Sequence, residues 1–302
     1  MATFRKTLIS GQLQYNLVLY LDDLLLNNGY YSNVDVGETI YSGGDLSRLS
    51  PYGDSFEFPT GAAWQAPKSN WVMEGDIGVP SGITAPILPS GVVINSTFYP
   101  SNDPTYAHSY NYKKGLVIFN NTAPLSTDMV QVSYSYKDVF VDFINKKTSF
   151  ALNNDYFGND AIPDIVFPSG TVSTPAVLID MSDHTIAPLQ IGGGKKIFKT
   201  VHLHLISSDD HAEEISDISD LISYKEFGLV KLLDIDKLPE RLTWDGDKAS
   251  TYQEYTTMLA DSTLFLNKAY IVRAEPVYLY TERENWNRIR IDLLLEVWDE
   301  KI

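Results

Sequence analysis

The chain contains no cysteine. Disulfides, cysteine nucleophiles and zinc sites with cysteine ligands are therefore excluded. A protein without thiols behaves in the same way in a reducing cytoplasm and in an oxidising exterior. The 302 residues are enough to bury a sizeable core, and a chain of this length is expected to form two domains.

Basic residues are scarce relative to acidic ones. The chain has 23 Lys and Arg against 39 Asp and Glu, which gives a formal net charge of −16. Such an excess repels phosphate backbones and anionic lipid surfaces. A role in gripping DNA or a membrane surface is disfavoured, whereas an acidic wall that DNA slides past is compatible with the charge. Simple solubility is the plain alternative explanation.

Long apolar runs are also missing. The best candidate, residues 17–26, is interrupted by Asp22 and Asp23, and a membrane helix needs about 20 apolar residues. The same aspartates interrupt any signal-peptide core behind Arg5 and Lys6. We therefore expect a soluble protein that is synthesised in the cytoplasm and has no membrane partner.

The N-terminal region predicts a helix from about Gln12 to Asn27, with Ser10 as its N-cap and Asn28-Gly29 as its end. Its apolar side chains recur at helical spacing: Leu13, Leu17, Leu21 and Leu24. This stripe is expected to pack within the chain or, alternatively, against a neighbouring subunit.

Residues 30–89 are rich in Gly, Pro, Ser and Asn, with aromatic residues scattered among them. These aromatic residues are Tyr52, Phe56, Phe58, Trp64 and Trp71. We interpret the segment as loops and short strands held by aromatic anchors, a design typical of surfaces that meet other subunits. From Gly91 to Phe143 apolar and polar residues alternate, as Val130 to Tyr136 illustrates, which predicts an antiparallel sandwich or small barrel.

The second half of the chain mixes both periods. Long strands are expected over residues 197–206, 264–280 and 286–298, and a turn at Gly192 to Gly194. An acidic helix over residues 209–222 would bury Ile215, Ile218 and Ile222. The predicted fold class is β-rich α+β. The expected domains are residues 1–144, with the N-terminal helix and the β-sandwich or barrel, and residues 175–302, joined by a linker at 145–174.

Two histidines are the first candidates for chemistry. His202 and His204 are two residues apart on a predicted strand, so both side chains leave the same face. Together with His211, or with Asp209 and Asp210, they would supply donors for a metal, and zinc needs three or four converging ligands. Solvent-facing strand histidines are the preferred interpretation.

The remaining motifs indicate no catalytic site. Gly192 to Lys196 lacks the spacing of a phosphate-binding loop and leads into a strand, so a hairpin turn is preferred. Acid pairs of the kind that glycosidases use occur at Asp22-Asp23, Asp234 with Asp236, and Asp245 with Asp247. No Gly-x-Ser-x-Gly elbow occurs. We predict a non-enzymatic protein with no catalytic, cofactor-binding or metal site.

Two regions resemble a known class of proteins. The sequences of residues 106–110 (YAHSY), 114–119 (KGLVIF) and 130–136 (VQVSYSY) are similar to a β-domain of virion structural proteins of tailed bacteriophages. Residues 175–302, with a Gly-rich turn, a His-Leu-His-Leu-Ile strand, an acidic helix and an amphipathic last strand, resemble the tail-terminator and tail-completion proteins of the phage neck. Tail terminators are shorter, and the simplest of them have no counterpart of the N-terminal half.

The resemblance implies an α+β sheet whose copies close into a ring around the DNA channel at the head–tail junction. The implied partners are identical subunits and other neck, tail tube, sheath or baseplate proteins of the virion, and DNA would pass through without specific binding. Whether the acidic helix at 209–222 faces the lumen stays open. The alternatives are a baseplate or tail-tip protein, a carbohydrate-binding adhesin-like module and, third, a glycoside-cleaving enzyme.

Overall fold

The computed structural model describes ten stretches of the chain: residues 2–37, 45–53, 58–143, 174–188, 195–208, 212–225, 228–234, 237–243, 246–279 and 286–299. The chain forms two compact units. Unit 1 comprises Met1–Leu25, Val139–Leu238 and Met258–Ile302, and unit 2 comprises Leu26–Asp138 and Pro239–Thr257. The chain therefore passes between the units four times.

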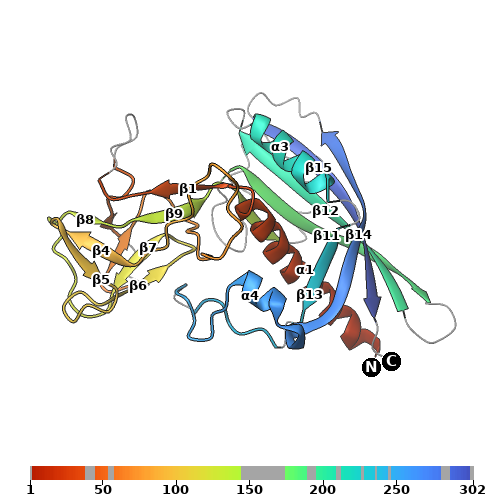
Figure 1. Ribbon diagram of the computed structural model, residues 1–302, viewed down its shortest axis with the longest axis horizontal. Helices are drawn as coiled ribbons and strands as arrows, with labels where there is room; N and C mark the ends of the chain where they lie inside the picture. Colours follow the sequence, from red (N-terminus) through yellow and green to blue (C-terminus); the bar gives the residue numbers. More distant parts are fainter. Residues whose placement is uncertain are drawn as a thin grey trace. The chain divides into compact units, whose positions relative to one another are not determined.

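Unit 1 is built on a six-stranded sheet of order β10-β11-β12-β15-β14-β13 (Figure 1). The strands are β10 (Phe140–Phe143), β11 (Ala176–Pro188), β12 (Lys195–Ser208), β13 (Leu229–Leu233), β14 (Phe265–Leu279) and β15 (Trp286–Asp299). Only β10 and β11 run parallel, and the other neighbours are antiparallel. The predicted β-rich α+β class is confirmed, and so are the long strands.

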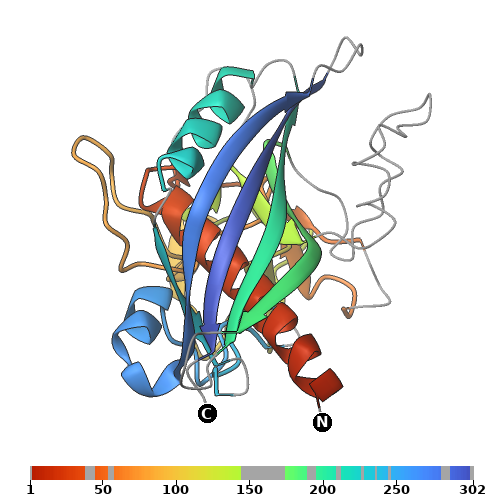
Figure 2. The ribbon, with the colours of Figure 1, turned by 90° about the vertical axis from the view of Figure 1, so that its right-hand side faces the viewer.

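Helix α1 (Ala2–Leu26) lies behind the curved strands of this sheet in Figure 2, and helix α3 (Ala212–Ser223) packs on β12, β14 and β15. Alternate residues of β12 and β15 are buried on one face, for example Val201 and Leu203. The predicted stripe on α3 is confirmed, because Ile215, Ile218 and Ile222 are all buried. A short helix α4 (Tyr255–Ala260) and a 3-10 turn η3 (Ser262–Leu264) precede β14.

The N-terminal helix is longer than predicted. It begins at Ala2 instead of Gln12, so Ser10 lies inside it and is not its cap. The predicted end is confirmed, since Gly29 has a φ of 87° and its N–H donates to the Leu26 carbonyl oxygen at 3.0 Å. Its predicted leucine stripe is buried within the chain.

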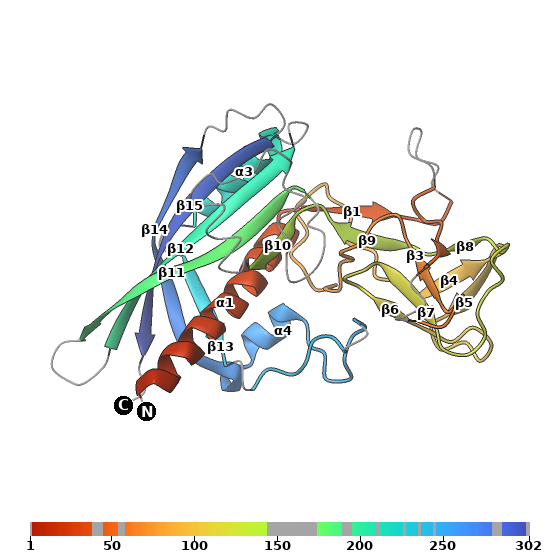
Figure 3. The ribbon, with the colours of Figure 1, turned by 180° about the vertical axis from the view of Figure 1, so that it is seen from behind.

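The division into units differs from the sequence-based domains at three places. Residues 139–143 belong to unit 1. Helix α1 also belongs to unit 1, together with the second-half sheet, and Figure 3 draws both. The side chains of Gln12 and Asn16 hydrogen bond to Leu233 of β13. Residues 239–257 belong to unit 2. The predicted linker at 145–174 lies outside the described residues except for Thr174.

Unit 2 contains three small antiparallel sheets. The first is β2 (Ser50–Pro51), β3 (Ala63–Gln65), β7 (Leu116–Phe119) and β6 (His108–Asn111); the second is β5 (Thr97–Pro100), β4 (Gly91–Ile94) and β8 (Val130–Gln131); the third is β1 (Tyr31–Val34) with β9 (Tyr134–Lys137). Their inward residues share one apolar core. The alternation thus predicted real antiparallel strands up to residue 137, whereas the last strand of the stretch, β10, pairs parallel with β11 in unit 1.

The aromatic anchors of unit 2 are core residues. Trp64 and Trp71 are each 1% exposed, and the Trp71 ring stacks on Tyr134 with centroids 4.6 Å apart. Phe58 is buried as well, and Phe56 lies outside the described residues. Trp64 and Trp71 therefore anchor unit 2 from within, as the sequence predicted, and their rings are not available to another subunit.

The segment Pro239–Thr257 is joined to the rest of unit 2 by polar contacts. The Tyr252 hydroxyl donates to the Met73 carbonyl oxygen at 2.9 Å, and the Tyr255 N–H donates to the Glu74 carboxylate at 3.0 Å. The other Glu74 oxygen pairs with the Arg241 guanidinium. This segment therefore completes unit 2, although its sequence position lies far from the rest of the unit. Among the described helices, none is long and apolar enough to cross a membrane.

Candidate functional site

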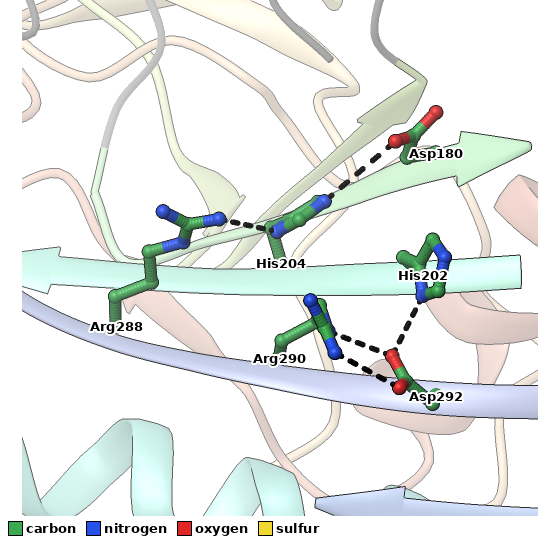
Figure 4. A network of polar contacts seen from close by, with 6 residues as sticks. All are labelled: Asp180, His202, His204, Arg288, Arg290 and Asp292. Atoms are coloured by element: carbon green, nitrogen blue, oxygen red, sulfur yellow. Dashed lines mark hydrogen bonds and ion pairs between the residues drawn. The ribbon is translucent and has the colours of Figure 1, made fainter. Parts of the chain in front are cut away.

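A network of polar side chains lies across the six-stranded sheet, on the face opposite Val201 and Leu203. We call it the strand network, and it consists of Asp180, His202, His204, Arg288, Arg290 and Asp292 (Figure 4). Strand register explains the grouping, because His202 lies opposite both Asp180 on β11 and Asp292 on β15. Directly opposed side chains on one face are close enough to interact. The network is the densest group of ionisable side chains that the described strands bring together.

The partly exposed half of the network is centred on Asp292. The His202 imidazole donates from Nδ1 to the Asp292 carboxylate at 2.6 Å. The Arg290 guanidinium donates to the same carboxylate from Nη2 at 3.1 Å, and its Nε lies 2.8 Å from it as an ion pair. Partial burial opposes ionisation of Asp292, but the hydrogen bonds from His202 and Arg290 lower its pKa below the usual value. Asp292 is therefore a structural anion that ties β12 to β15.

The inner half is centred on a buried histidine. His204 is fully buried, and its Nδ1 accepts a hydrogen bond from the Arg288 guanidinium at 3.1 Å. Since an arginine can only donate, the His204 proton sits on Nε2, which faces the Asp180 carboxylate at 3.9 Å. Burial is the main reason that the pKa of His204 lies below its usual value, and the nearby Arg288 charge lowers it further. His204 is thus held neutral.

The two histidines share one face of β12, as their spacing predicted. His202 is partly exposed, but His204 is fully buried, so the expectation that His204 faces solvent is wrong. The neighbours of His204 give the physical reason: the buried side chains of Arg288 and Asp180 lie against the two nitrogens of its ring.

Among the described residues, no three or more His, Asp or Glu side chains are placed so that they could hold a metal ion together. The Nδ1 atoms of His202 and His204 are each engaged with Asp292 and Arg288, respectively. The further ligands considered from the sequence, Asp209, Asp210 and His211, lie outside the described residues. The two histidines of β12 therefore link neighbouring strands through polar contacts and are not arranged as ligands of a metal ion.

The lowered pKa of His204 predicts acid sensitivity. Its pKa in the folded protein lies below the value of about 6.5 in an unfolded chain, so the unfolded state binds the proton first. The free energy of unfolding should fall as the pH drops below about 6.5, by at most about 1.4 kcal/mol per pH unit for this histidine. Urea denaturation between pH 7.5 and 5 measures this slope.

His204→Asn is the matched variant for that experiment, because the asparagine carbonyl oxygen can still accept from Arg288 but does not titrate in this range. We expect a shallower dependence of unfolding free energy on pH in this variant. His108 of unit 2 also contributes to the slope, since burial lowers its pKa as well. An identical slope in the wild type and in His204→Asn would contradict the assignment.

The other candidate residues from the sequence do not lie together. Lys196, from the Gly-rich motif, lies near the start of strand β12, as predicted, and its ammonium pairs with the Glu296 carboxylate at 2.7 Å. The glycines of that motif lie outside the described residues. Asp234 is buried, with Lys237 at 3.6 Å, and its predicted partner Asp236 lies outside the described residues, as does Asp245. The pair Asp22-Asp23 sits on α1.

Part of unit 2 exposes large apolar side chains, a feature that sequence reasoning missed. Phe98 is 56% exposed and Leu125 is 69% exposed. Asn95 donates to the Asp128 carboxylate at 2.8 Å, and that carboxylate also accepts the Leu125 N–H at 2.7 Å. The hairpin between β4 and β5 is thereby tied to the segment before β8. We call Phe98, Leu125 and the nearby Met129, which is 36% exposed, the apolar tip.

The acidic helix carries its charge outward. On α3, Glu213, Asp217 and Asp220 are exposed, opposite the buried isoleucine stripe. The two early carboxylates Glu213 and Glu214 lie in the first turn, where they complement the positive end of the helix dipole. The predicted members Asp209 and Asp210 lie outside the described residues. This exposed face repels anions such as DNA phosphates.

Comparison of the chain with protein-family models, with curated proteins and with solved structures found no match.

Proposed function

We propose that this chain is a structural subunit of a tailed-phage virion, one copy in a ring at the head–tail junction through which DNA passes. The resemblance of residues 91–143 and 175–302 to phage virion proteins is the starting point. The fold is compatible with it, because a wide sheet of strands up to 15 residues long with helices α1 and α3 is an α+β layer of the implied kind. On this proposal the protein is non-enzymatic and resides in the virion.

The apolar tip is the observation that carries an assembly role. Phe98 and Leu125 are large apolar side chains exposed to solvent, Phe98 on strand β5 and Leu125 in a segment whose backbone bonds to the Asp128 carboxylate. Exposed apolar side chains that are rigidly presented lose little entropy on binding, and clusters of them mark protein–protein contacts. We infer that the apolar tip contacts a neighbouring subunit or another virion protein.

The negative charge supports a protein that DNA passes without being bound. The exposed carboxylates of α3 and the net charge of −16 oppose binding to phosphates. A subunit that faces a DNA channel gains from such repulsion, because DNA does not stick to it. Partners are then identical subunits and other neck, tail tube, sheath or baseplate proteins.

The carbohydrate-binding alternative loses two of its candidate stacking rings, because sugar stacking needs exposed aromatic rings and Trp64 and Trp71 are buried in the core of unit 2. Phe98 stays an exposed ring of that unit. A baseplate or tail-tip position stays within the same structural class and differs only in the station within the virion. A glycan array on the purified protein separates the classes, since a ring subunit should bind no sugar in a saturable manner.

Ring formation is the decisive test. We expect mass photometry and negative-stain microscopy of the purified protein, alone or with virion partners, to show closed rings of one defined mass. Phe98→Glu should reduce ring formation while its thermal unfolding stays close to that of the wild type, because Phe98 is more than half exposed. A strict monomer under all of these conditions would contradict the proposal.

A further inference from the structure

A histidine and a tyrosine form a hydrogen-bonded pair inside unit 2. His108 and Tyr110 are two residues apart on β6, so both side chains leave the same face of the strand. The Tyr110 hydroxyl lies 3.1 Å from His108 Nε2, and His108 Nδ1 lies 2.7 Å from the Tyr106 carbonyl oxygen. Because a carbonyl oxygen only accepts, Nδ1 carries the imidazole proton and Nε2 accepts from Tyr110. Both residues are buried, at 4% and 5% exposed.

The partner of the Tyr110 hydroxyl is a base, which distinguishes it from two other tyrosines of this core. The Tyr134 hydroxyl donates to the Leu46 carbonyl oxygen at 3.0 Å, and the Tyr252 hydroxyl donates to the Met73 carbonyl oxygen at 2.9 Å. A neutral imidazole takes up a proton readily, whereas a carbonyl oxygen hardly does. A phenol that loses an electron becomes a strong acid, so its oxidation is easiest where a base within hydrogen-bond reach accepts the proton.

A row of packed rings connects Tyr110 with the surface of unit 2. The centroid of the Trp71 ring lies 6.2 Å from that of Tyr110 and 4.6 Å from that of Tyr134, and Tyr134 lies 6.4 Å from Tyr136. Trp71 and Tyr134 are buried, and Tyr136 is only partly buried. Rings this close exchange electrons because their π systems are nearly in contact. We call these four residues the aromatic row.

The charges beside the aromatic row favour a positive charge at its inner end. The Lys68 ammonium lies 5.1 Å from the centroid of the Tyr136 ring, where it opposes the loss of an electron from that ring. At the other end, burial lowers the pKa of His108, but its bond to the backbone and the carboxylates of Asp103 and Asp247 act in the opposite direction. These carboxylates stabilise an imidazolium that forms there.

We propose that Tyr110 is a redox-active tyrosine, which one-electron oxidants convert to a neutral phenoxyl radical while its proton moves to His108. The oxidant takes one electron from the aromatic row, and Trp71 recovers it from Tyr110. The O–H bond of Tyr110 breaks, and its proton bonds to His108 Nε2. The oxidant is thus reduced by one electron, and the product is a phenoxyl radical beside an imidazolium.

The composition of the chain and the site of the pair support this role. The chain has no cysteine, so the oxidising equivalent does not end on a thiol. Return of one electron to Tyr110 brings the proton back from His108 and restores the pair. Unit 2 therefore holds one oxidising equivalent in its core, away from solvent. This inference is independent of the proposed virion ring.

Oxidation by azide radicals, which take single electrons from tyrosine and tryptophan, tests the proposal. After pulse radiolysis of the purified protein, we expect transient absorption and freeze-quench EPR to show a tyrosyl radical that outlives those of exposed tyrosines. Tyr110→Phe should lose this long-lived signal. Tyr112→Phe is the matched control, because that ring also borders Trp71, at 6.5 Å, but lies 5.5 Å from the Lys248 ammonium, which opposes its oxidation. It should keep the signal.

His108→Gln tests the proton acceptor. The glutamine oxygen can still accept from Tyr110, but an amide is not a base, so the long-lived signal should be lost here too. If this variant does not fold, EPR of the wild-type radical replaces it, and a proton held by His108 at the phenoxyl oxygen gives a coupling that disappears in D₂O. A long-lived signal in Tyr110→Phe, an unchanged signal in His108→Gln, or no exchangeable coupling would overturn the proposal. None of these results bears on ring formation, which Phe98→Glu tests.

Discussion

Arg241→Met should destabilise unit 2 by about 3–5 kcal/mol, because it leaves the Glu74 carboxylate buried without its cation. Glu74 and Arg241 have side chains that are only 6% and 14% exposed, and the Tyr255 N–H also binds the Glu74 carboxylate. The lost partner cannot be replaced by water at such a site. Urea denaturation followed by tryptophan fluorescence measures the change.

The double variant Glu74→Gln/Arg241→Met separates the charge from the packing. A neutral amide keeps a hydrogen-bond acceptor for Tyr255, so most of the lost stability should return. Arg273→Met is the control: its partner Glu275 is 3.6 Å away and both side chains are more than half exposed, so the expected loss is below about 1 kcal/mol. A double variant as unstable as Arg241→Met alone would show that the ion pair is not the cause.

Local periodicity was sufficient for the regular elements of the fold. The alternation in β15 and the stripe of Ile215, Ile218 and Ile222 on α3 each encode which face is buried, and the structure confirms both. Such patterns report burial but do not name the partner surface. The leucines of α1 predicted a buried helix, and nothing in their spacing distinguishes the sheet of unit 1 from the strands of unit 2.

The candidate site was less predictable, for a related reason. The spacing of His202 and His204 placed them on one face, but the burial of His204 depends on Asp180 and Arg288, which register brings in from β11 and β15. The Asn16–Leu233 contact joins residues 217 apart in sequence. The sequence did contain a signal for this contact. Gln12 and Asn16 lie beside the leucine stripe of the helix, and buried amide side chains need hydrogen-bond partners.

Residues 239–257 supply the second large expected effect. A fragment of residues 26–138 alone should fail to fold stably, whereas the same fragment joined to 239–257 by a Gly/Ser linker should unfold cooperatively. The shorter fragment loses the Arg241 partner of the Glu74 carboxylate, which costs at most about 3–5 kcal/mol. It also loses the partly buried ring of Tyr252, which contributes less than the roughly 1.5–3 kcal/mol of a fully buried side chain. The sum is comparable to the whole stability of a small domain.

Thermal unfolding and two-dimensional NMR of both fragments measure the difference. The control is the joined fragment with Arg241→Met and Tyr252→Ala, which keeps the chain length but removes the contacts to Glu74 and Met73. It should behave like the short fragment. Equal melting temperatures for the short and joined fragments would mean that unit 2 folds without this segment. The expected result instead means that unit 2 forms only after most of the chain is synthesised, since its last stretch follows β13.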